Sequence, residues 1–182
     1  MEQFKRQWQQ IDIPELLTSL GEDLGREGLE DTPQRVSKAW KEMLRGYTMD
    51  PRDILSKVFE NEGLGIQMCR NIEFTSLCEH HFLSFFGYIS IAYMPSDTVV
   101  GLSKLARVVD CFACRLQIQE RLVEQIADAL EESLKPKFII VLASARHLCC
   151  VGRGIKKSSM LFETYATRGE IPSWVAPELL RA

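Results

Sequence analysis

Every histidine in this chain lies close to a cysteine in the sequence. His80 and His81 follow Cys78 within three residues, and His147 comes two residues before Cys149. Thiolates and imidazoles are preferred zinc ligands, and a catalytic zinc site keeps three protein ligands and one position for water. Cys78, one of its two neighbouring histidines and Cys149 would make such a set. The remaining histidines would then lie near the metal as acid–base groups.

The alternative for these residues is that they are buried thiols and hydrogen-bonded histidines without a metal. A lone cysteine favours that interpretation, because free cysteines are among the residues most often buried. Five such residues in two short clusters favour a metal site instead. Their spacing is not a zinc-finger signature, so it does not by itself identify the metal.

The other cysteines carry less information. Cys111 and Cys114 form a C-x-x-C pair, a spacing common in zinc and redox sites, but they lie inside an apolar stripe typical of a helix. No histidine is left to complete a second site, so we expect both to be plain thiols. Cys69 has no partner, and Cys150 is expected to point away from its neighbour Cys149.

The segment Gly101–Arg107 is a candidate anion site. Ser103 is a favoured helix N-cap residue, and the free N–H groups at a helix start bind phosphate well. Lys104 and Arg107 are three residues apart and share a face. Arg153 lies between two glycines that would let a bound group approach the backbone. These cations could equally be solvated surface charges, and the spacing does not decide between the two.

A polar stretch between two apolar stripes contains Gln119 and Glu120. The carboxylate of Glu120 can accept two N–H donors from the edge of a guanine base, with Gln119 assisting. Helix capping is the simpler interpretation of these residues, and the local pattern favours it.

The composition is that of an ordinary globular protein. The chain has 182 residues, of which 46% are apolar and 26% charged, with a net charge of −3 and a pI near 5.7. This length predicts one domain or two tightly joined domains. The net negative charge excludes general electrostatic binding to nucleic acid. No apolar run reaches the roughly 18 residues of a membrane span, and the start of the chain has no signal-peptide h-region. We therefore expect a cytoplasmic protein without nucleic-acid or membrane partners.

The hydrophobic pattern predicts an N-terminal helical region followed by an α+β region. Residues 1–60 show helical spacing, with Thr32 as a cap, Pro33 in the first turn of a helix and Gly46 at its end. Residues 61–182 follow the order strand, strand, helix, helix, strand, strand. The predicted elements are strands 71–77 and 85–94, helical stripes 105–112 and 122–134, and strands 138–142 and 158–167. A sheet with so few strands leaves exposed edges, so we expect a homo-oligomer.

Several segments together resemble the GTP cyclohydrolase I family. The resemblance covers residues 15–158. It rests on the motifs SLCEHH, GLSKLARVV and QERL, and on the stretches GREGLEDTPQRVSKAW, IAYMP, LQIQERLVEQIADAL and HLCCVGRGIKK. These motifs in combination are far more specific than any single short motif.

The resemblance implies a fold, an activity and an assembly. Members of this family convert GTP and water into 7,8-dihydroneopterin triphosphate and formate, and their product feeds tetrahydrofolate biosynthesis. They have the tunnelling fold and form a homodecamer of two face-to-face pentamers, with active sites at subunit interfaces. We therefore expect Zn²⁺ as the cofactor, GTP as the substrate, and a tunnelling-fold catalytic domain over residues 61–182.

The resemblance also implies roles for single residues. Water activated at the zinc would add to C8 of the purine, one histidine would protonate N7, and another would assist rearrangement of the ribose with a serine. The matching positions are the zinc ligands Cys78, His81 and Cys149, the catalytic residues His147, His80 and Ser103, the triphosphate-binding residues Lys104, Arg107, Arg153 and, from a neighbouring subunit, Lys38, and the guanine-binding pair Gln119 and Glu120.

The sequence departs from the family pattern in several places. Ser144 stands where an acid usually precedes His147, Cys150 where Met is usual, and Cys114 where Arg or Gln is common, and residues 158–161 match poorly. If the missing acid tunes His147, activity or its pH optimum changes. The alternatives are a related cyclohydrolase acting on another purine nucleotide, and a silent paralogue that binds a nucleotide or a regulatory partner. A purely structural zinc module would need a closed four-ligand site.

Overall fold

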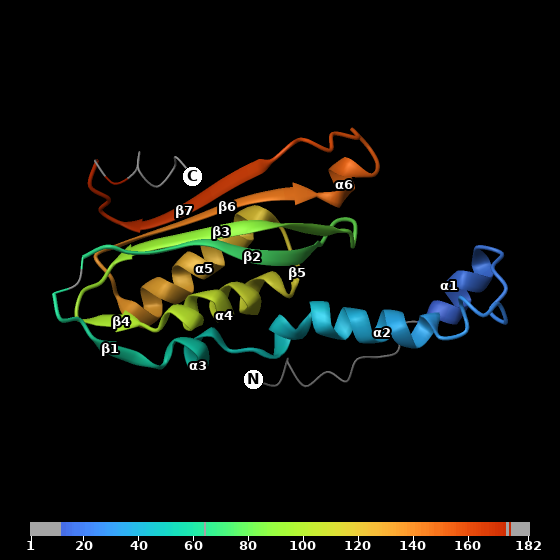
Figure 1. Ribbon diagram of the computed structural model, residues 1–182, viewed down its shortest axis with the longest axis horizontal. Coiled ribbons are helices and arrows are strands. Elements are labelled where there is room, and N and C mark those ends of the chain that lie inside the picture. Colours follow the sequence, from blue (N-terminus) through green and yellow to red (C-terminus); the bar gives the residue numbers. More distant parts are fainter. Residues whose placement is uncertain (1–11, 64, 174, 176–182) are drawn as a thin grey trace.

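The computed structural model describes residues 12–63, 65–173 and 175, and a curved five-stranded sheet lies at its centre (Figure 1). The strand order is β5-β2-β3-β6-β7. The strands are β2 (Gln67–Cys78), β3 (Ser84–Met94), β5 (Leu116–Gln117), β6 (Phe138–His147) and β7 (Phe162–Gly169). Neighbouring strands are antiparallel, except that the short β5 runs parallel to the end of β2. A separate small sheet pairs β1 (Val58–Glu60) with β4 (Thr98–Val100).

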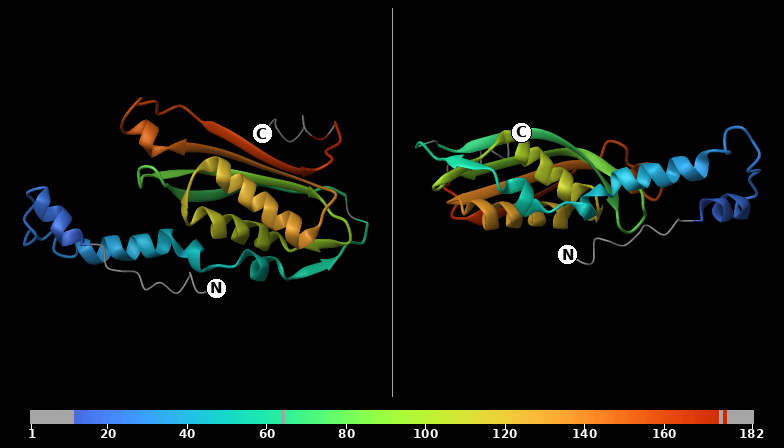
Figure 2. Two further views of the ribbon diagram at one scale, coloured as in Figure 1. Left: turned by 180° about the vertical axis from the view of Figure 1, so that it is seen from behind. Right: turned by 90° about the horizontal axis from the view of Figure 1, so that it is seen from below.

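Two helices, α4 (Leu102–Ala113) and α5 (Gln119–Leu134), cover one face of the sheet (Figure 2). Successive side chains of a strand point to opposite faces, so alternate residues of a strand face the helices. In β6 these residues are fully buried: Ile139, Val141, Ala143 and Ala145. The predicted helical stripes are confirmed as the buried faces of α4 and α5.

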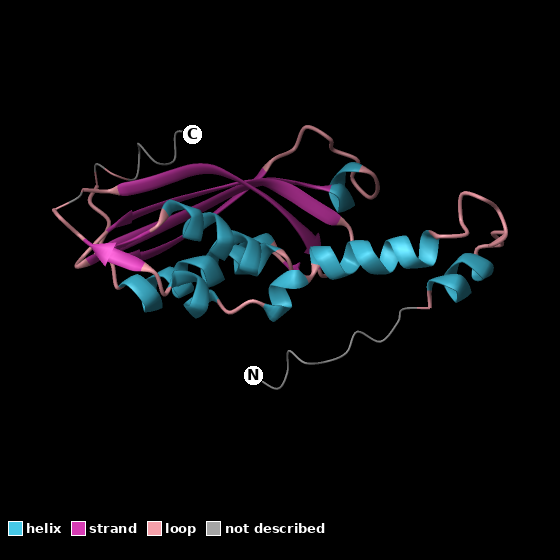
Figure 3. Cartoon of the chain, turned by 60° about the horizontal axis from the view of Figure 1, so that its bottom comes forward, coloured by secondary structure: helices cyan, strands magenta, loops and turns pink. Residues whose placement is uncertain are grey.

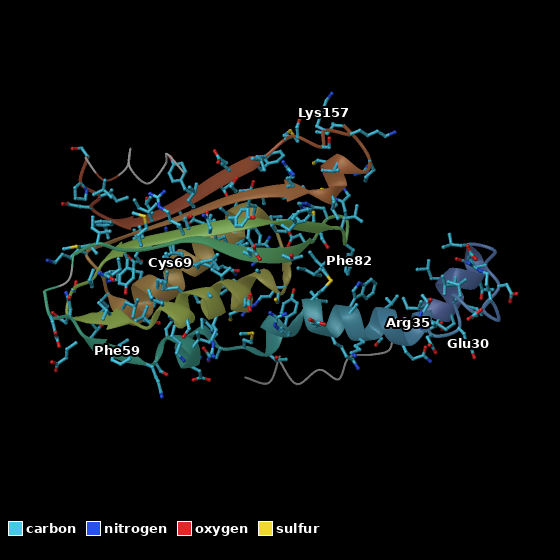
Figure 4. The ribbon with its side chains drawn as sticks, viewed as in Figure 1. Glu30, Arg35, Phe59, Cys69, Phe82 and Lys157 are labelled. Carbon is cyan, nitrogen blue, oxygen red and sulfur yellow. The ribbon has the colours of Figure 1, made fainter. Side chains whose placement is uncertain are left out.

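Four short helices precede the sheet: α1 (Ile13–Ser19), α2 (Thr32–Met43), the 3-10 helix η2 (Arg45–Thr48) and α3 (Pro51–Leu55). The helices α1 and α2 extend beyond one end of the sheet (Figure 3), whereas η2 packs against α4 and α3 packs against both α4 and α5. No residue of α2 is buried, but the ring of Trp40 lies 5.9 Å from that of Phe82, and Figure 4 shows Phe82 beside α2. Residues 1–11 of the predicted helical region lie outside the described residues, and the domain boundary after residue 60 stays a prediction.

The order predicted for the main elements is confirmed, because β2, β3, α4, α5, β6 and β7 follow one another along the chain. The protein therefore has a mixed α+β fold. The short elements β1, β4, β5 and α6 (Leu148–Val151) were not predicted, because two to four residues are too few to show a hydrophobic period. Among the described residues, no helix has both the length and the apolar character needed to cross a membrane.

Two strands differ from their predicted extents. β6 continues to His147 instead of ending at residue 142, because Ala143 and Ala145 keep the same alternating burial with small side chains. β7 begins at Phe162 rather than at residue 158. The chain before it turns, and Lys156 adopts a positive φ of 52° there.

Two predicted helix caps were wrong. Asp31, not Thr32, is the N-cap position of α2, and the hydroxyl of Thr32 donates backward to a carbonyl instead. Pro33 lies in the first turn, as predicted. Gly101, not Ser103, is the N-cap position of α4, and no side chain caps that helix. Ser103 is therefore the second residue of the helix, and it is exposed.

Gly46 does not close α2, which ends at Met43. It is a buried residue of η2, where an added Cβ would lie 2.4 Å from the carbonyl oxygen of Cys111. Glycine is needed here because two backbones approach closely.

Candidate active site

The three predicted metal ligands converge at one end of the sheet. Cys78 is the last residue of β2, His81 lies in the turn that follows, and Cys149 lies in α6 directly after β6. Their ligand atoms all lie within 4.8 Å of one another, and Sγ of Cys78 is 3.6 Å from Nδ1 of His81. The ligands meet because β2 and β6 both pair with the beginning of β3.

The donor set and its spacing fit zinc. In tetrahedral zinc sites, with Zn–S near ~2.3 Å and Zn–N near ~2.0 Å, sulfur and nitrogen ligands are roughly 3.5 Å apart. The distance of 3.6 Å between Cys78 and His81 agrees with this value. Among the residues that the structure describes, no further Cys, His, Asp or Glu joins the group. A three-ligand set fits a catalytic site better than the closed site of a structural zinc module.

The thiol of Cys149 needs a cation to lose its proton at neutral pH. Burial, together with the neighbouring Cys150 and Cys78, raises the pKa of Cys149 to about 11. A thiol with this pKa is protonated at neutral pH, and metal coordination is what makes such a thiol a thiolate. The Sγ of Cys150 lies 3.9 Å from that of Cys149, so the expectation that Cys150 points away from its neighbour was wrong, although Cys150 is outside the ligand group.

The structure distinguishes the two adjacent histidines that the residue pattern left open. His80 has Nδ1 3.9 Å from Sγ of Cys78, yet its side chain is 64% exposed and it is not part of the ligand group. Its Nε2 lies 4.0 Å from a carboxylate oxygen of Glu79. Both histidines are exposed, and membership of the ligand group distinguishes them: His81 belongs to the group, whereas His80 lies beside it.

His147 is enclosed by aromatic rings and held by one amide. Its ring stacks on Phe85 with centroids 4.6 Å apart, and the edge of Phe162 lies 5.4 Å away. Nε2 of His147 is 2.8 Å from Oε1 of Gln119. Burial lowers the pKa of His147, and the charge of Glu120 opposes this effect. Neither phenylalanine was predicted from the sequence, because only the β3–β6 register brings Phe85 opposite His147.

The amide of Gln119 is engaged inside the chain. The side chain is 2% exposed, and Nε2 donates to the carbonyl oxygens of Ala143 at 3.2 Å and Phe162 at 2.9 Å. Two acceptors at Nε2 fix the amide so that Oε1 faces His147. Glu120, by contrast, is exposed in the first turn of α5, where no side-chain cap bond forms. The guanine-binding roles of both residues stay predictions.

The predicted triphosphate-binding residues do not all gather at the metal end within one chain. The helix α4 begins directly after β4, at the opposite end of the sheet, and runs back toward β5 (Figure 1). The helix has 12 residues and is about 18 Å long, and Ser103 and Lys104 lie in its first turn, at the end away from the ligands (Figure 1). Arg107 is exposed one turn further along, Arg153 is exposed at the metal end after α6, and Lys38 is exposed on α2.

Comparison with known proteins identifies the family of this chain. The sequence profile of GTP cyclohydrolase I matches residues 10–176. This chain belongs to the GTP cyclohydrolase I family. A relative named GTP cyclohydrolase 1 from Wolinella succinogenes is 51% identical over 158 residues, which cover 86% of this chain and 84% of that protein. Proteins of the same name from Streptococcus mutans and Deinococcus radiodurans are 49% and 47% identical and cover 86% and 85% of this chain, and 82% and 72% of their own lengths.

The predicted family and enzyme class are therefore confirmed, and the match extends beyond the predicted residues 15–158. A solved structure titled "Crystal structure of the archaeosine synthase QueF-Like in the apo form" has a TM-score of 0.47 and 18% identity, covering 61% of this chain and 100% of that one. A likeness of this degree carries no conclusion about fold or function.

Ser144, the main departure from the GTP cyclohydrolase I pattern, lies on the opposite face of β6 from His147. The two residues are three apart on one strand, so their side chains point to different faces. Ser144 lines a cavity of about 730 Å³ together with Arg146, Tyr88 and Cys114. An acid at this position would point into that cavity, so the expectation that its absence tunes His147 is not supported.

Proposed function

We propose that this member of the GTP cyclohydrolase I family hydrolyses GTP to 7,8-dihydroneopterin triphosphate and formate at a zinc ion held by Cys78, His81 and Cys149. The observation that carries the proposal is the three-ligand group, with atoms within 4.8 Å of one another, at the same end of the sheet as His147. When bound, zinc supplies a Lewis acid that activates water near neutral pH.

The proton-transfer group of the proposed reaction is His147. Gln119 holds its Nε2, so Nδ1 remains available to carry a proton to N7 of the purine. The stacked ring of Phe85 and the edge of Phe162 keep water from the imidazole. In the proposal, His80 beside the ligands assists the ribose steps together with Ser103.

Guanine recognition is assigned to the exposed carboxylate of Glu120. Glu120 directly follows Gln119, whose side-chain amide holds His147. A carboxylate accepts two parallel N–H donors, which matches one edge of guanine. Because a polar site left unpaired is costly, a base lacking the second donor is expected to be rejected.

The triphosphate is assigned to the cations Lys104, Arg107, Arg153 and Lys38. Within one chain the helix that carries Lys104 and Arg107 begins at the end of the sheet opposite the zinc ligands (Figure 1), which supports the proposal that a second copy brings its α4 to the metal end of the first. The exposed edges of the sheet support assembly as well. A tunnelling-fold decamer of two pentamers is the arrangement that we propose.

The proposed reaction is tested by incubating zinc-replete protein with GTP, oxidising the product and measuring neopterin fluorescence and formate. We expect both signals to disappear with a chelator and to return on addition of zinc. Protein that carries one zinc per chain but releases no formate from GTP would contradict the proposal. Zinc-independent turnover would overturn the metal assignment alone.

A further inference from the structure

We propose that Arg121 is a positioning residue, which holds the metal-ligand loop against the start of α5 through an ion pair with Glu79. The inference rests on the proposed function, since it concerns the geometry of the same site. Neither residue has a role in the ligand, proton-transfer or nucleotide-binding sets described above.

The guanidinium of Arg121 and the carboxylate of Glu79 form a bidentate ion pair, called the fork below. Nη2 of Arg121 donates to Oε1 of Glu79 at 2.9 Å, and Nη1 donates to Oε2. Paired N–H donors on a planar guanidinium fix the orientation of a carboxylate, as well as its distance. The two residues are 42 positions apart in the sequence, so the fork joins two separate elements.

The ion pair joins the loop that carries the ligands Cys78 and His81 to the helix that begins with Gln119. Glu79 lies between the ligands Cys78 and His81, and Arg121 is the third residue of α5. The backbone N–H of Glu79 already donates to the carbonyl of Gln117 at 3.0 Å. Other backbone bonds lie within the loop, and the fork adds a side-chain link from Glu79 to α5.

The loop has a conformation that needs outside support. Phe82 adopts a positive φ of 54°, which is unfavourable for a bulky side chain and persists only where surrounding contacts impose it. Its N–H donates to the carbonyl of Cys78 at 2.9 Å, and its ring contacts Trp40. Loss of the Arg121 fork would release the carboxylate of Glu79, which lies 4.0 Å from Nε2 of His80 when the fork is formed.

The effect is expected in the geometry of the site rather than in overall stability. The side chains of Arg121 and Glu79 are 42% and 30% exposed, and half-exposed ion pairs contribute little to the free energy of unfolding. Groups that orient metal ligands, however, commonly change metal affinity or activity by about 10–100-fold when removed.

The test uses three variants: Arg121→Gln, Glu79→Gln and the double variant that combines them. Each is compared with the control variant Arg168→Gln. Arg168 of β7 is the matched control. It forms similar ion pairs with Glu124 and Asp128 of α5, the helix that also carries Arg121, and these pairs lie away from the metal-ligand loop. Zinc affinity is measured by chelator competition, and kcat and KM for GTP are measured at saturating zinc. We expect both single variants to bind zinc about tenfold more weakly and to lose about tenfold in kcat, with little change in KM or melting temperature.

The double variant is expected to lose no more than either single variant, because both remove one interaction. Arg121→Lys is expected to recover part of the loss, since lysine restores the charge without the fork. The inference is overturned if Arg121→Gln keeps wild-type zinc affinity, or if Arg168→Gln loses as much. If the wild type releases no formate from GTP, the proposed function fails, while the zinc affinities still decide the role of Arg121.

Discussion

His147 donates its Nε2–H to Oε1 of Gln119 across 2.8 Å, and this bond joins the end of β6 to the first residue of α5. The direction of the bond follows from Gln119, whose amide nitrogen is occupied by two carbonyl acceptors. Neutral His147 is therefore protonated on Nε2, and Nδ1 is the nitrogen free to exchange a proton with a substrate.

Replacing Gln119 with Leu removes the acceptor that selects this tautomer. We expect ¹⁵N NMR of metal-free protein to show Nε2-protonated His147 in the wild type and a mixture of tautomers in Gln119→Leu. The carbonyl oxygens of Ala143 and Phe162 also lose a donor, and because that of Ala143 is buried, the loss costs about 1–3 kcal/mol of unfolding free energy. A variant with an unchanged tautomer would show that another group orients His147.

The lowered pKa of His147 predicts how stability depends on pH. Burial places the folded-state pKa below the ordinary value of 6.5, so the unfolded chain binds more protons between the two values. The stabilisation is therefore complete above about pH 6.5 and is lost as the pH falls through the folded-state pKa. Urea unfolding of metal-free protein across this range is expected to show a smaller decrease for His147→Asn than for the wild type. Equal decreases would mean that other groups cause the dependence.

Adjacent cysteines provide a matched test of the ligand set. We expect Cys149→Ser to lose stoichiometric zinc and turnover together, because one of three ligands is removed. Cys150→Ser is the control, since Cys150 lies next to the site but outside the group. Metal analysis after dialysis and the formate assay measure both properties. Retained zinc in Cys149→Ser, or lost zinc in Cys150→Ser, would contradict the assignment.

The position of Ser144 predicts a negative result for a family-like substitution. Ser144→Glu places a carboxylate in the cavity beside Arg146, on the far face of β6 from His147. We expect the pH profile of kcat to keep its midpoints within about 0.5 pH unit, since no charge is added near the imidazole. A larger shift would show that the two faces of β6 are coupled.

Much of this protein was predictable from its sequence, because the strongest signals are periodic or clustered. The stripes of α4 and α5 and the order of the main strands follow from hydrophobic spacing, which reflects burial directly. The clusters around Cys78 and Cys149 indicated a metal site, and the motif combination indicated the family. The helix caps at Thr32 and Ser103 were wrong, because several short polar residues compete for each cap position and local sequence does not rank them.

The sequence by itself determined the residue types of the site and the elements that carry them, since both are local properties of the chain. Only the tertiary structure decided which nitrogen of His147 is held and which aromatic rings enclose its imidazole. Those answers depend on strand register and on contacts between residues far apart in sequence, such as Arg121 with Glu79. A shift of one residue in register would move each side chain to the other face of the sheet, and nothing in the local sequence records that choice.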